Sequence, residues 1–353
     1  MYIEQSKKML NTYLLDILRK YSDENHRLSQ AEILQRLERD YSMTVDRKTI
    51  KRNLMDLIEF DKNICFTEKT RKNKYGEEET VYSEWYIERD FSDAELRLLI
   101  DSILFSKHIP YNQCKELIEK LKTLSNIYFN AKVKHICNMP ENMPSNKELF
   151  YTIDILDEAI SKNNQVSFLY TDYDIDKQKH PRKNNKGEIR TYIINPYQIV
   201  ATNGRYYLIC NYDKYDDLSN YRLDRIKDIK LLDTHAKPIK KIKGLEQGLN
   251  LPKHMAEHIY MFAGESVNVK FRAQRYIVNE IIDWFGMDVN FSSSTDTEVD
   301  VWVKVNEKAF FYWAIQYAEH ITVLEPQSVV DIIKKTILNI KNNIMINNSK
   351  GMI

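Results

Sequence analysis

The chain has 353 residues, of which 43% are hydrophobic and 29% are charged, a composition typical of a globular protein too long for one ordinary core. Its 52 basic and 51 acidic residues give a formal net charge of +1, which excludes a globally basic nucleic-acid binder and confines any such footprint to a local surface. With only 8 glycines and 8 prolines, collagen-like and linker-dominated chains are excluded as well.

The N-terminal part predicts three helices followed by a β-hairpin. Apolar residues at helical spacing indicate helices over residues 7–20, 30–41 and 47–60. Ser29 and Glu32 form the pattern of a capping box at the start of the second helix, and Asp46 is a good N-cap for the third. Two β-type runs, 63–69 and 79–88, then flank a polar turn. Three helices and a hairpin in this order are typical of a winged helix-turn-helix.

Basic side chains gather on the first turns of the third predicted helix, beside its apolar stripe rather than within it. In a helix-turn-helix these turns meet base edges and phosphates, and the threonine there can contact a phosphate or a thymine methyl group. The candidate DNA-binding residues on this helix are Arg47, Lys48, Thr49, Lys51 and Arg52. The plain alternative is a solvated helix face, but the stretch contains no acid and falls at the recognition position.

The hairpin supplies a second set of basic residues that could follow the adjacent DNA backbone. These candidates are Lys69, Arg71, Lys72 and Lys74. The alternative is that the acidic residues of the same hairpin neutralise them, namely Glu77, Glu78 and Glu79. The sequence leaves both interpretations open.

Residues 91–146 are predicted to form a helical connector. Ser92 is a good N-cap for a helix that Pro110 ends, and helical spacing resumes over 113–129. A linker is then indicated by Pro140, Asn142, Pro144 and Ser145.

From Tyr151 a predicted helix leads into five short strands, which suggest a small β-barrel. The strands are expected over residues 165–170, 189–195, 197–201, 205–212 and 218–232. An irregular stretch follows. The last part alternates strand, helix, strand, strand, helix, strand and helix, which indicates an α+β sandwich of ferredoxin-like type.

The segment 190–229 carries the most specific motifs. It holds the triplet Tyr206-Tyr207-Leu208, an upstream proline-containing strand over 192–197, and a downstream strand over 221–226 with two arginines around an aspartate. These motifs resemble the WYL domain family, named for a Trp-Tyr-Leu triplet, with tyrosine here in place of the tryptophan.

The resemblance extends to both sides, because Val45 to Leu54 looks like the winged-helix half found ahead of such domains. The C-terminal third looks like the WCX extension found after them. It implies a multidomain α+β protein: a winged helix-turn-helix, a helical connector, an Sm/SH3-like barrel and a ferredoxin-like WCX domain. The expected boundaries are 1–90, 91–146, 147–235 (WYL), 236–264 (linker) and 265–353 (WCX).

The resemblance implies a ligand-responsive bacterial transcription regulator, often a homodimer, associated with DNA-damage responses and phage-defence loci. Its partners would be double-stranded operator DNA and an anionic ligand, such as a short oligonucleotide or a nucleotide. Arginine recognises phosphate bidentately and tyrosine stacks on bases. The candidate ligand-binding residues are Tyr170, Tyr192, Tyr206, Tyr221, Arg222 and Arg225.

Two of these residues have an open geometry. Regular alternation would place Arg222 and Arg225 on opposite faces of a strand, so only a twist, a bulge or the end of the strand would let both reach one ligand. The alternative for Arg225 is a structural ion pair with Asp224 or Asp228. The expected barrel core includes Ile193, Pro196, Tyr207 and Leu208.

The location expected from the sequence is cytoplasmic. The cysteines Cys65, Cys114, Cys137 and Cys210 form no Cys-x-x-Cys pair, which fits a reducing compartment. The N-terminal segment lacks the apolar core of a secretory signal, and no apolar run is long enough to cross a bilayer, so no membrane contact is expected.

Two rival classes remain. An enzyme is disfavoured because the sequence holds no HExxH, GxxxxGK[ST] or GxGxxG motif and no His/Cys cluster, so we expect no catalysis and no cofactor or metal. The other rival is an accessory or adaptor protein, for example of a phage-defence system, that does not bind duplex DNA and whose barrel binds single-stranded nucleic acid. Its partner surface could include Trp284, Trp302, Phe310 and Trp313, although these aromatics also suit a core or a dimer face.

Overall fold

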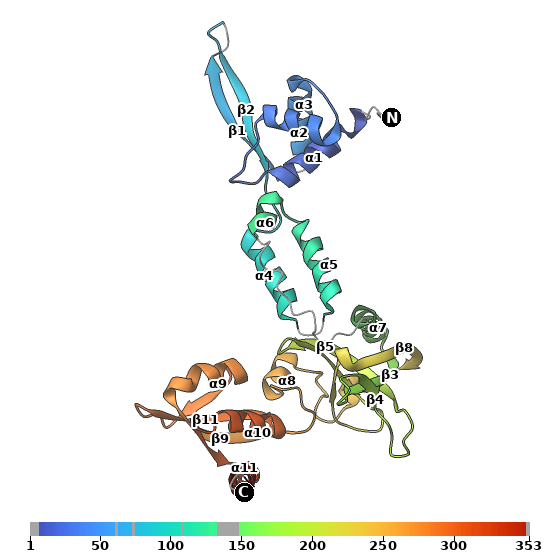
Figure 1. Cartoon of the computed structure of the whole chain (residues 1–353), viewed down its shortest axis with the longest axis vertical. Helices are drawn as coiled ribbons and strands as arrows, with labels where there is room; N and C mark the ends of the chain where they lie inside the picture. The colour runs from blue at the N-terminus through green and yellow to red at the C-terminus, as the bar shows by residue number, and fades with distance from the viewer. Residues whose placement is uncertain (1–6, 61–62, 73–74, 107–108, 133–147, 351–353) are drawn as a thin grey trace. The chain divides into compact units, whose positions relative to one another are not determined.

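A computed structural model describes residues 7–60, 63–72, 75–106, 109–132 and 148–350 (Figure 1). The chain divides into two compact units, Met1–Ser145 and Asn146–Ile353. Within the described residues, no helix combines the length and the apolar character that a membrane span requires. The predicted mixed α+β, multidomain architecture is confirmed.

The first unit begins with three helices and a hairpin, as predicted. They are α1 (Leu10–Tyr21), α2 (Gln30–Tyr41), α3 (Arg47–Phe60), β1 (Ile64–Lys72) and β2 (Glu78–Ile87), after a short turn of 3₁₀ helix. Both oxygen-based caps form: Ser29 and Glu32 make a capping box on α2, and Asp46 accepts a hydrogen bond from the Thr49 N–H at 2.9 Å. The apolar stripes of the three helices meet in one core with Trp85.

Leu28 anchors the hairpin to the helices. Its N–H and C=O exchange hydrogen bonds of 2.8 Å with the C=O and N–H of Trp85 on β2. The pair is an isolated β-bridge, because Leu28 itself belongs to no named strand. Trp85 is fully buried, so the base of the hairpin is fixed in the core.

The connector contains three helices, α4 (Asp93–Phe105), α5 (Tyr111–Lys122) and α6 (Ile127–Lys132). The predicted continuous helix over 113–129 is wrong. The chain breaks after Lys122 because Asn126 starts a new helix, accepting hydrogen bonds from the N–H groups of Tyr128 and Phe129 at 3.0 and 3.1 Å. The predicted linker residues Pro140, Asn142, Pro144 and Ser145 lie outside the described residues.

Asn126 also joins the connector helices to the segment that follows α1. Its buried amide donates to the Ser22 carbonyl oxygen at 3.1 Å and to Asp23 at 2.6 Å. Burial alone would raise the pKa of Asp23, but hydrogen bonds from Asn126 and His26 outweigh burial and hold the pKa below its ordinary value. The His26 ring stacks on Tyr128 with centroids 3.6 Å apart. This joint fixes α6 against the end of α1.

The second unit begins with a helix on a six-stranded sheet, in the region where the sequence predicts a small barrel. Its elements are α7 (Leu149–Lys162), β3 (Asn164–Tyr173), β4 (Lys179–Pro181), β5 (Thr191–Thr202), β6 (Arg205–Asn211), β7 (Ser219–Arg222), a 3₁₀ turn η2 (Leu223–Arg225) and β8 (Ile226–His235). The strand order is β4-β3-β5-β6-β7, and β8 pairs with the other side of β3. The helix α7 covers the sheet at β3, β5 and β8.

Two of the predicted strands are one in the structure. β5 pairs with β3 up to Ile194 and with β6 from Asn195 onward, so the strand changes partner at the Asn195–Pro196 step. A proline lacks the N–H that a central strand needs, and here it stands where the ladder changes and a bulge follows. The predicted break between the strands 189–195 and 197–201 is therefore wrong, because β5 continues through Pro196 while its pairing partner changes.

Two further corrections concern burial and the last strand. The prediction that Ile193 is a core residue is wrong, because its side chain is 52% exposed. Alternation along β5 places it on the other face of the strand from the buried Tyr192 and Ile194. Pro196 and Leu208 are buried as predicted, and Tyr207 is half-buried. The predicted strand over 218–232 is split into β7 and β8 by η2.

The stretch after the barrel is not wholly irregular. It contains the 3₁₀ turn η3 (Ile239–Lys241) and the helix α8 (Leu251–Glu257). Met261 packs with Val200 and Ile209, and this small cluster attaches the stretch to the outer face of the barrel.

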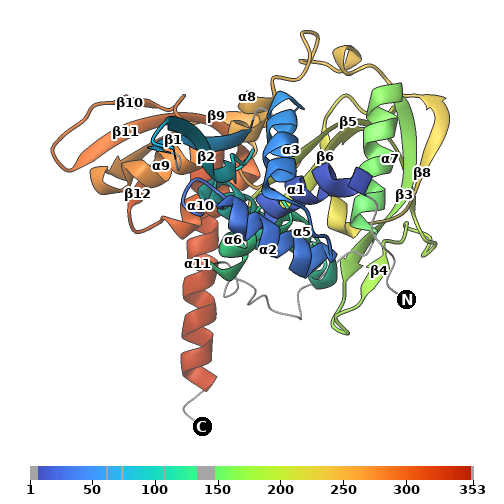
Figure 2. The same ribbon diagram turned by 90° about the horizontal axis from the view of Figure 1, so that it is seen from above.

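The last part contains β9 (Ser266–Gln274), a 3₁₀ turn η4 (Arg275–Ile277), α9 (Val278–Phe285), β10 (Asn290–Ser292), β11 (Glu298–Asn306), α10 (Glu307–Gln316), β12 (Ile321–Glu325) and α11 (Gln327–Lys350). The antiparallel sheet has the order β10-β11-β9-β12, so the predicted alternation of strands and helices is confirmed. Phe310 and Trp313 are fully buried in its core, Trp284 packs against it, and Trp302 is partly exposed. Figure 2 shows α11 along its length, continuing past the rest of this domain.

Replacing Asn126 tests the joint between α6 and the end of α1. Asn126→Ala removes the cap of α6 and leaves Asp23 without its buried amide partner, so the free energy of unfolding should fall by about 2 kcal/mol. Denaturant unfolding followed by tryptophan fluorescence measures this change. Thr123→Ala removes an exposed hydroxyl nearby and serves as the control, with an expected change below about 0.5 kcal/mol. Equal effects of the two variants would contradict the assigned role of Asn126.

Candidate functional site

The first turns of α3 present cationic side chains to solvent. Arg47, Lys48 and Arg52 are exposed, and none of them forms an ion pair with a described residue. Lys51 is half-buried, with its ammonium 4.5 Å from the centroid of the Tyr82 ring on β2. Four of the five predicted residues on this helix therefore form one basic surface, which the Lys51–Tyr82 contact ties to the hairpin.

Thr49 has a different place from the one expected. Its hydroxyl donates to Asp46 at 2.7 Å while its N–H donates to the other carboxylate oxygen at 2.9 Å. The Thr49 hydroxyl is the main cause that lowers the pKa of Asp46. Asp46, the single acid next to the basic turn, therefore caps the N-terminus of α3. The Thr49 hydroxyl is already hydrogen-bonded to Asp46.

The hairpin carries its own counter-charges. Lys69 is hydrogen-bonded to Glu84, and Arg71 pairs with Glu79 at 3.4 Å. Lys72 forms no ion pair with any described residue, although it lies opposite Glu78 in the β1–β2 register. Lys74 lies outside the described residues. The geometry favours the interpretation in which hairpin acids offset hairpin cations, although the partners of Lys69 and Arg71 are Glu84 and Glu79 rather than the whole acidic run.

In the barrel, three of the predicted tyrosines meet. The ring centroids of Tyr170 and Tyr221 are 4.8 Å apart, those of Tyr192 and Tyr221 are 5.5 Å apart, and those of Tyr170 and Tyr192 are 6.1 Å apart. The Tyr221 hydroxyl shares a hydrogen bond of 2.6 Å with Tyr212, whose pKa burial raises to about 12. Tyr206 lies on β6 opposite Ala201, two positions nearer the β5–β6 turn than the residue that pairs with Tyr221.

Two of these rings cannot stack on a ligand in this arrangement. Tyr192 is 2% exposed and Tyr170 is similarly buried, so neither offers a free ring face to solvent. Each instead supports an arginine: the Arg182 guanidinium lies 4.8 Å from the Tyr170 centroid, and that of Arg190 lies 4.5 Å from the Tyr192 centroid. These tyrosines position cations at the surface of the barrel.

The arginines that the sequence singled out lie in a larger group, here called the cationic cluster: Lys179, Arg182, Arg222 and Arg225 around Asp172 and Asp224. Arg222 binds Asp224 through two hydrogen bonds of 3.0 and 2.7 Å. Arg225 donates to Asp172 at 2.9 Å, and Arg182 donates to the same carboxylate. Lys179 donates to the Asp224 backbone oxygen at 2.7 Å.

The end of β7 brings the two predicted arginines to one cluster. The strand stops at Arg222, and residues 223–225 form the 3₁₀ turn η2, in which side chains three apart lie above one another. This is the strand end that the sequence required for both to reach one ligand. The sequence leaves open a structural ion pair of Arg225 with Asp224 or Asp228. Arg225 does form an ion pair, but with Asp172 on β3, because Arg222 occupies Asp224.

The cluster keeps an excess of positive charge, because four cations share two carboxylates. Hydrogen bonding by Arg182 is the main cause that lowers the pKa of Asp172, and Arg225 and Arg222 act in the same direction. Burial lowers the pKa of Lys179, and Arg222 and Arg225 add to that effect against Asp224. The buried Nε of Arg225 has no hydrogen-bond partner among the described residues. A cluster of guanidinium and ammonium groups with an excess of positive charge can hold a phosphate or another oxyanion.

Sequence reasoning missed Lys179, Arg182 and Asp172. The signal was present as a run of basic residues between β3 and β5, but only pairing of β4 with β3 brings it to η2. Among the described residues, no three His, Cys, Asp or Glu side chains are grouped so that they could hold a metal ion.

The segment that holds the tyrosines and the cationic cluster matches a known family. Residues 151–231 match the model of the WYL domain family. This chain contains a WYL domain. The match begins in α7 and ends in β8, so it includes every predicted ligand-binding residue of the WYL domain and both carboxylates of the cluster.

Two solved structures are similar to the chain as a whole. One is the proteasome accessory factor B/C (PafBC) of Arthrobacter aurescens, with 13% identity and a TM-score of 0.30 over 94% of this chain and 48% of that chain. The other is a CRISPR Cas-related protein, with 13% identity and a TM-score of 0.36 over 99% of this chain and 88% of that chain. The chain thus spans about half the length of the PafBC chain. A comparison with curated proteins found no match.

The shared carboxylate of the cluster can be tested by titration. Because the pKa of Asp172 is held below its ordinary value of 3.8, the ion pairs that depend on its charge persist at neutral pH and are lost as the pH falls through that lowered pKa. Arg182→Gln should move the midpoint for Asp172, measured by carboxyl NMR, back toward 3.8. Arg71→Gln on the hairpin is the control and should leave it in place. An Asp172 midpoint that ignores Arg182 would contradict this geometry.

Proposed function

We propose that the chain is a ligand-responsive bacterial transcription regulator that binds operator DNA through α3 and senses an anionic nucleic-acid fragment through its WYL domain. The observation that carries the DNA-binding half is the set of exposed cations Arg47, Lys48 and Arg52 on the first turns of α3. They form no ion pair within the part of the chain that the structure describes, and the chain as a whole has a net charge of only +1. Asp46 leaves these cations available, because its carboxylate is occupied by the helix end.

We assign the parts of the chain to four domains and a linker. Residues 1–90 are a winged helix-turn-helix, 91–146 a helical connector, 147–235 an Sm- or SH3-like barrel, and 265–353 a WCX domain after a linker. The hairpin serves mainly as a support for α3 through Lys51 and Tyr82, because its cations Lys69 and Arg71 are already paired with acids. Operator contacts by Lys69 and Arg71 would require these ion pairs to open. The protein acts in the cytoplasm without catalysis.

The ligand half rests on the cationic cluster. A phosphate-bearing fragment suits it because the cluster offers several guanidinium groups with an excess of positive charge. Arg182 and Arg225 share the half-exposed carboxylate of Asp172. Arg222, in contrast, donates one hydrogen bond to each carboxylate oxygen of the buried Asp224. We therefore assign the direct contacts to Arg182 and Arg225, and a supporting role to Arg222, Tyr170 and Tyr192.

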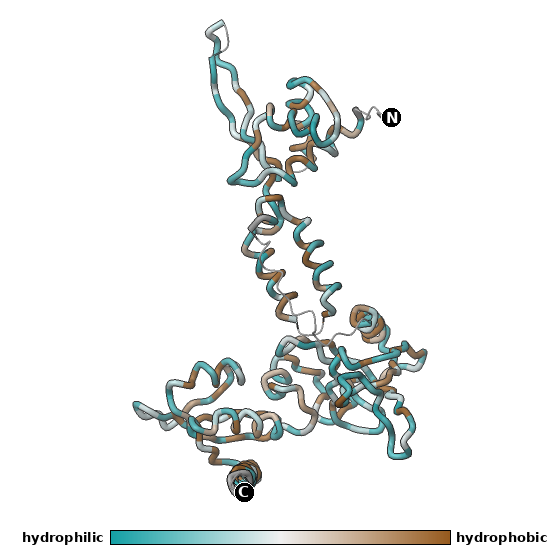
Figure 3. The backbone as a smooth tube through the Cα atoms, in the orientation of Figure 1, coloured by the Kyte–Doolittle hydropathy of each residue, from teal (hydrophilic) through white to brown (hydrophobic). Residues whose placement is uncertain are grey.

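A regulator of this kind acts on a paired site, and α11 supports a homodimer. Apolar residues alternate along it at spacings of three and four, the repeat that brings two helices together. The seam consists of Val330, Ile333, Ile337, Ile340 and Ile344. Ile333 packs against the domain core, whereas Ile337, Ile340 and Ile344 are exposed. Figure 3 colours the backbone by hydropathy and shows apolar positions, in brown, in the helix beside the C-terminus. Lys334 and Lys341 flank one side of the seam, so parallel packing avoids placing lysines opposite each other.

The DNA-binding half is tested with the double variant Arg47→Ala/Arg52→Ala. Loss of two groove-facing cations should weaken binding to a mixed-sequence duplex at least about tenfold and should lower the slope of log affinity against log salt by about two. Fluorescence anisotropy over a salt series measures both. The control Arg71→Ala removes a hairpin cation already paired with Glu79 and should change affinity by about threefold or less.

The same experiment separates the adaptor alternative, which the acid-matched hairpin favours. Absence of duplex binding at low salt, with binding of single-stranded oligonucleotides retained, would replace the regulator with an accessory protein. An affinity that does not change with salt would contradict phosphate-led docking of any kind.

The dimer is tested on α11. Ile340→Asp places a charge in the seam and should convert the protein to monomers, as measured by light scattering after size-exclusion chromatography. Leu338→Asp is the matched control, because Leu338 lies off the seam and is more exposed, 59% against 45% for Ile340. A monomeric wild-type chain, or equal dissociation of both variants, would exclude α11 as the dimer contact.

A further inference from the structure

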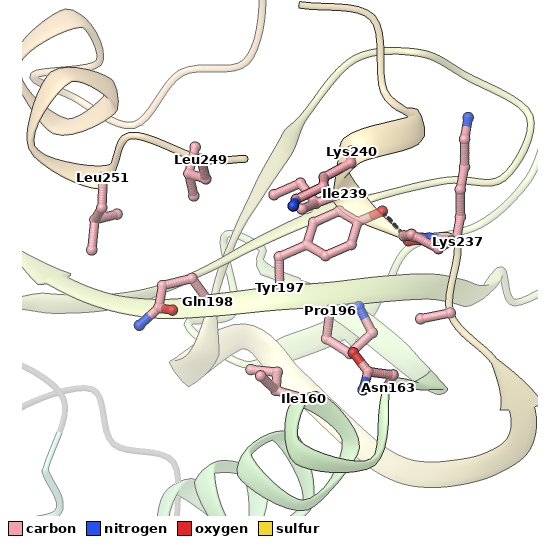
Figure 4. A pocket seen from close by; sticks show the side chains of 12 residues that line it. Ile160, Asn163, Pro196, Tyr197, Gln198, Lys237, Ile239, Lys240, Leu249 and Leu251 are labelled. Carbon is pink, nitrogen blue, oxygen red and sulfur yellow. Dashed lines mark hydrogen bonds between the residues drawn. The ribbon is translucent and has the colours of Figure 1, made fainter. Parts of the chain in front are cut away.

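A second cavity of the same unit lies away from the cationic cluster. It has a volume of about 470 Å³ and lies between the end of α7, the second half of β5 and the segment 236–251, here called the strap (Figure 4). Its walls are mostly aliphatic, from Ile160, Pro196, Ile239, Leu249 and Leu251. No residue of the cationic cluster lines it. A cavity of this size with an apolar lining and a few polar groups is typical of a small-molecule site.

Hydrogen bonds hold the first part of the strap against the barrel. The Ala236 N–H donates to the Asn163 backbone oxygen at 2.7 Å, and the Lys237 N–H donates to the buried Asn195 side chain at 3.0 Å. The Tyr197 hydroxyl donates to the Lys237 backbone oxygen at 2.8 Å, as Figure 4 shows. One wall of the cavity is thereby fixed before any ligand arrives, which reduces the entropy lost on binding.

The charges around the cavity select the sign of a ligand. Its lining contains two lysines, Lys237 and Lys240, and no aspartate or glutamate. The Lys237 ammonium is engaged by Asp216 at 2.8 Å, whereas Lys240 is exposed and forms no ion pair with a described residue. Burial raises the pKa of Tyr197, so its hydroxyl stays neutral and adds no negative charge to the wall. An anionic group is therefore favoured beside Lys240, and a cationic one is not.

We propose that this cavity binds a small organic anion with an apolar body, a medium-chain or aromatic carboxylate, whose carboxylate pairs with Lys240 while its body contacts Ile160, Leu249 and Leu251. The site lies on the strap that leads from the barrel to the last domain. It is therefore a second input to the protein, separate from the oligonucleotide site and independent of whether that proposal holds.

The test uses decanoate as the probe, with decyltrimethylammonium as a probe of equal tail and opposite charge. Isothermal titration of the full chain below the critical micelle concentration should show saturable binding of decanoate and no saturable binding of the cation. Lys240→Glu should weaken decanoate binding about tenfold or more, because a charged contact at the cavity mouth is reversed. Lys241→Glu, on the same strap but outside the lining, should change it about threefold or less.

A second variant tests the cavity itself without changing charge. Ala236→Phe places a ring in the cavity and should abolish decanoate binding, while circular dichroism and oligonucleotide binding remain those of the wild type. Equal binding of the two probes, equal effects of Lys240→Glu and Lys241→Glu, or decanoate binding retained in Ala236→Phe would each overturn the proposal. Retained binding in that variant would place decanoate on another apolar surface, such as α11.

Discussion

Asp224 is 4% exposed and is bound on both carboxylate oxygens by Arg222, while Asp172 holds Arg182 and Arg225 from two other elements. A carboxylate removed from water is stable only when it is paired, so Asp224 fixes the guanidinium at the end of β7. Through Asp172 the same principle joins β3, the β4 segment and η2. Three arginines are bound by these two acids, so cations outnumber carboxylates here.

This arrangement explains how a nearly neutral chain can hold two separate groups of side chains with an excess of positive charge. On the hairpin, Lys69 and Arg71 face Glu84 and Glu79, and little charge is left over. On α3 and in the cationic cluster the acids are fewer than the cations. The excess charge lies where the proposed duplex and the proposed phosphate-bearing ligand would need it.

Local signals in the sequence predicted much of the fold. The capping box of Ser29 and the cap by Asp46 depend on residues three apart, and the helix stripes depend on a short repeat, so both can be read without knowing the fold. The WYL motifs located the barrel. The break before α6 was not predicted, because Asn126 forms its hydrogen bonds with Ser22 and Asp23, which lie more than one hundred positions away in the sequence.

The site was predicted only in part, for the same reason. Tyr170, Tyr192 and Tyr221 were identified and do meet, but their burial gives two of them a supporting role. The partner of Arg225 is Asp172, 53 residues away, and no spacing rule in the sequence distinguishes it from the nearer acids. Ladder pairing of distant strands decides such contacts, and the partner change at Asn195 within β5 shows that even strand boundaries depend on it.

The most direct measurement of the central claim is an NMR titration that follows the guanidinium Nε–H signals of the arginines in the cationic cluster. With a 5′-phosphorylated dinucleotide as ligand, the signals of Arg182 and Arg225 should shift saturably together, and that of Arg222 should shift less because Asp224 holds it. Binding that leaves Arg182 and Arg225 unmoved would show that the ligand lies elsewhere and that the cluster is only a structural tie of the barrel.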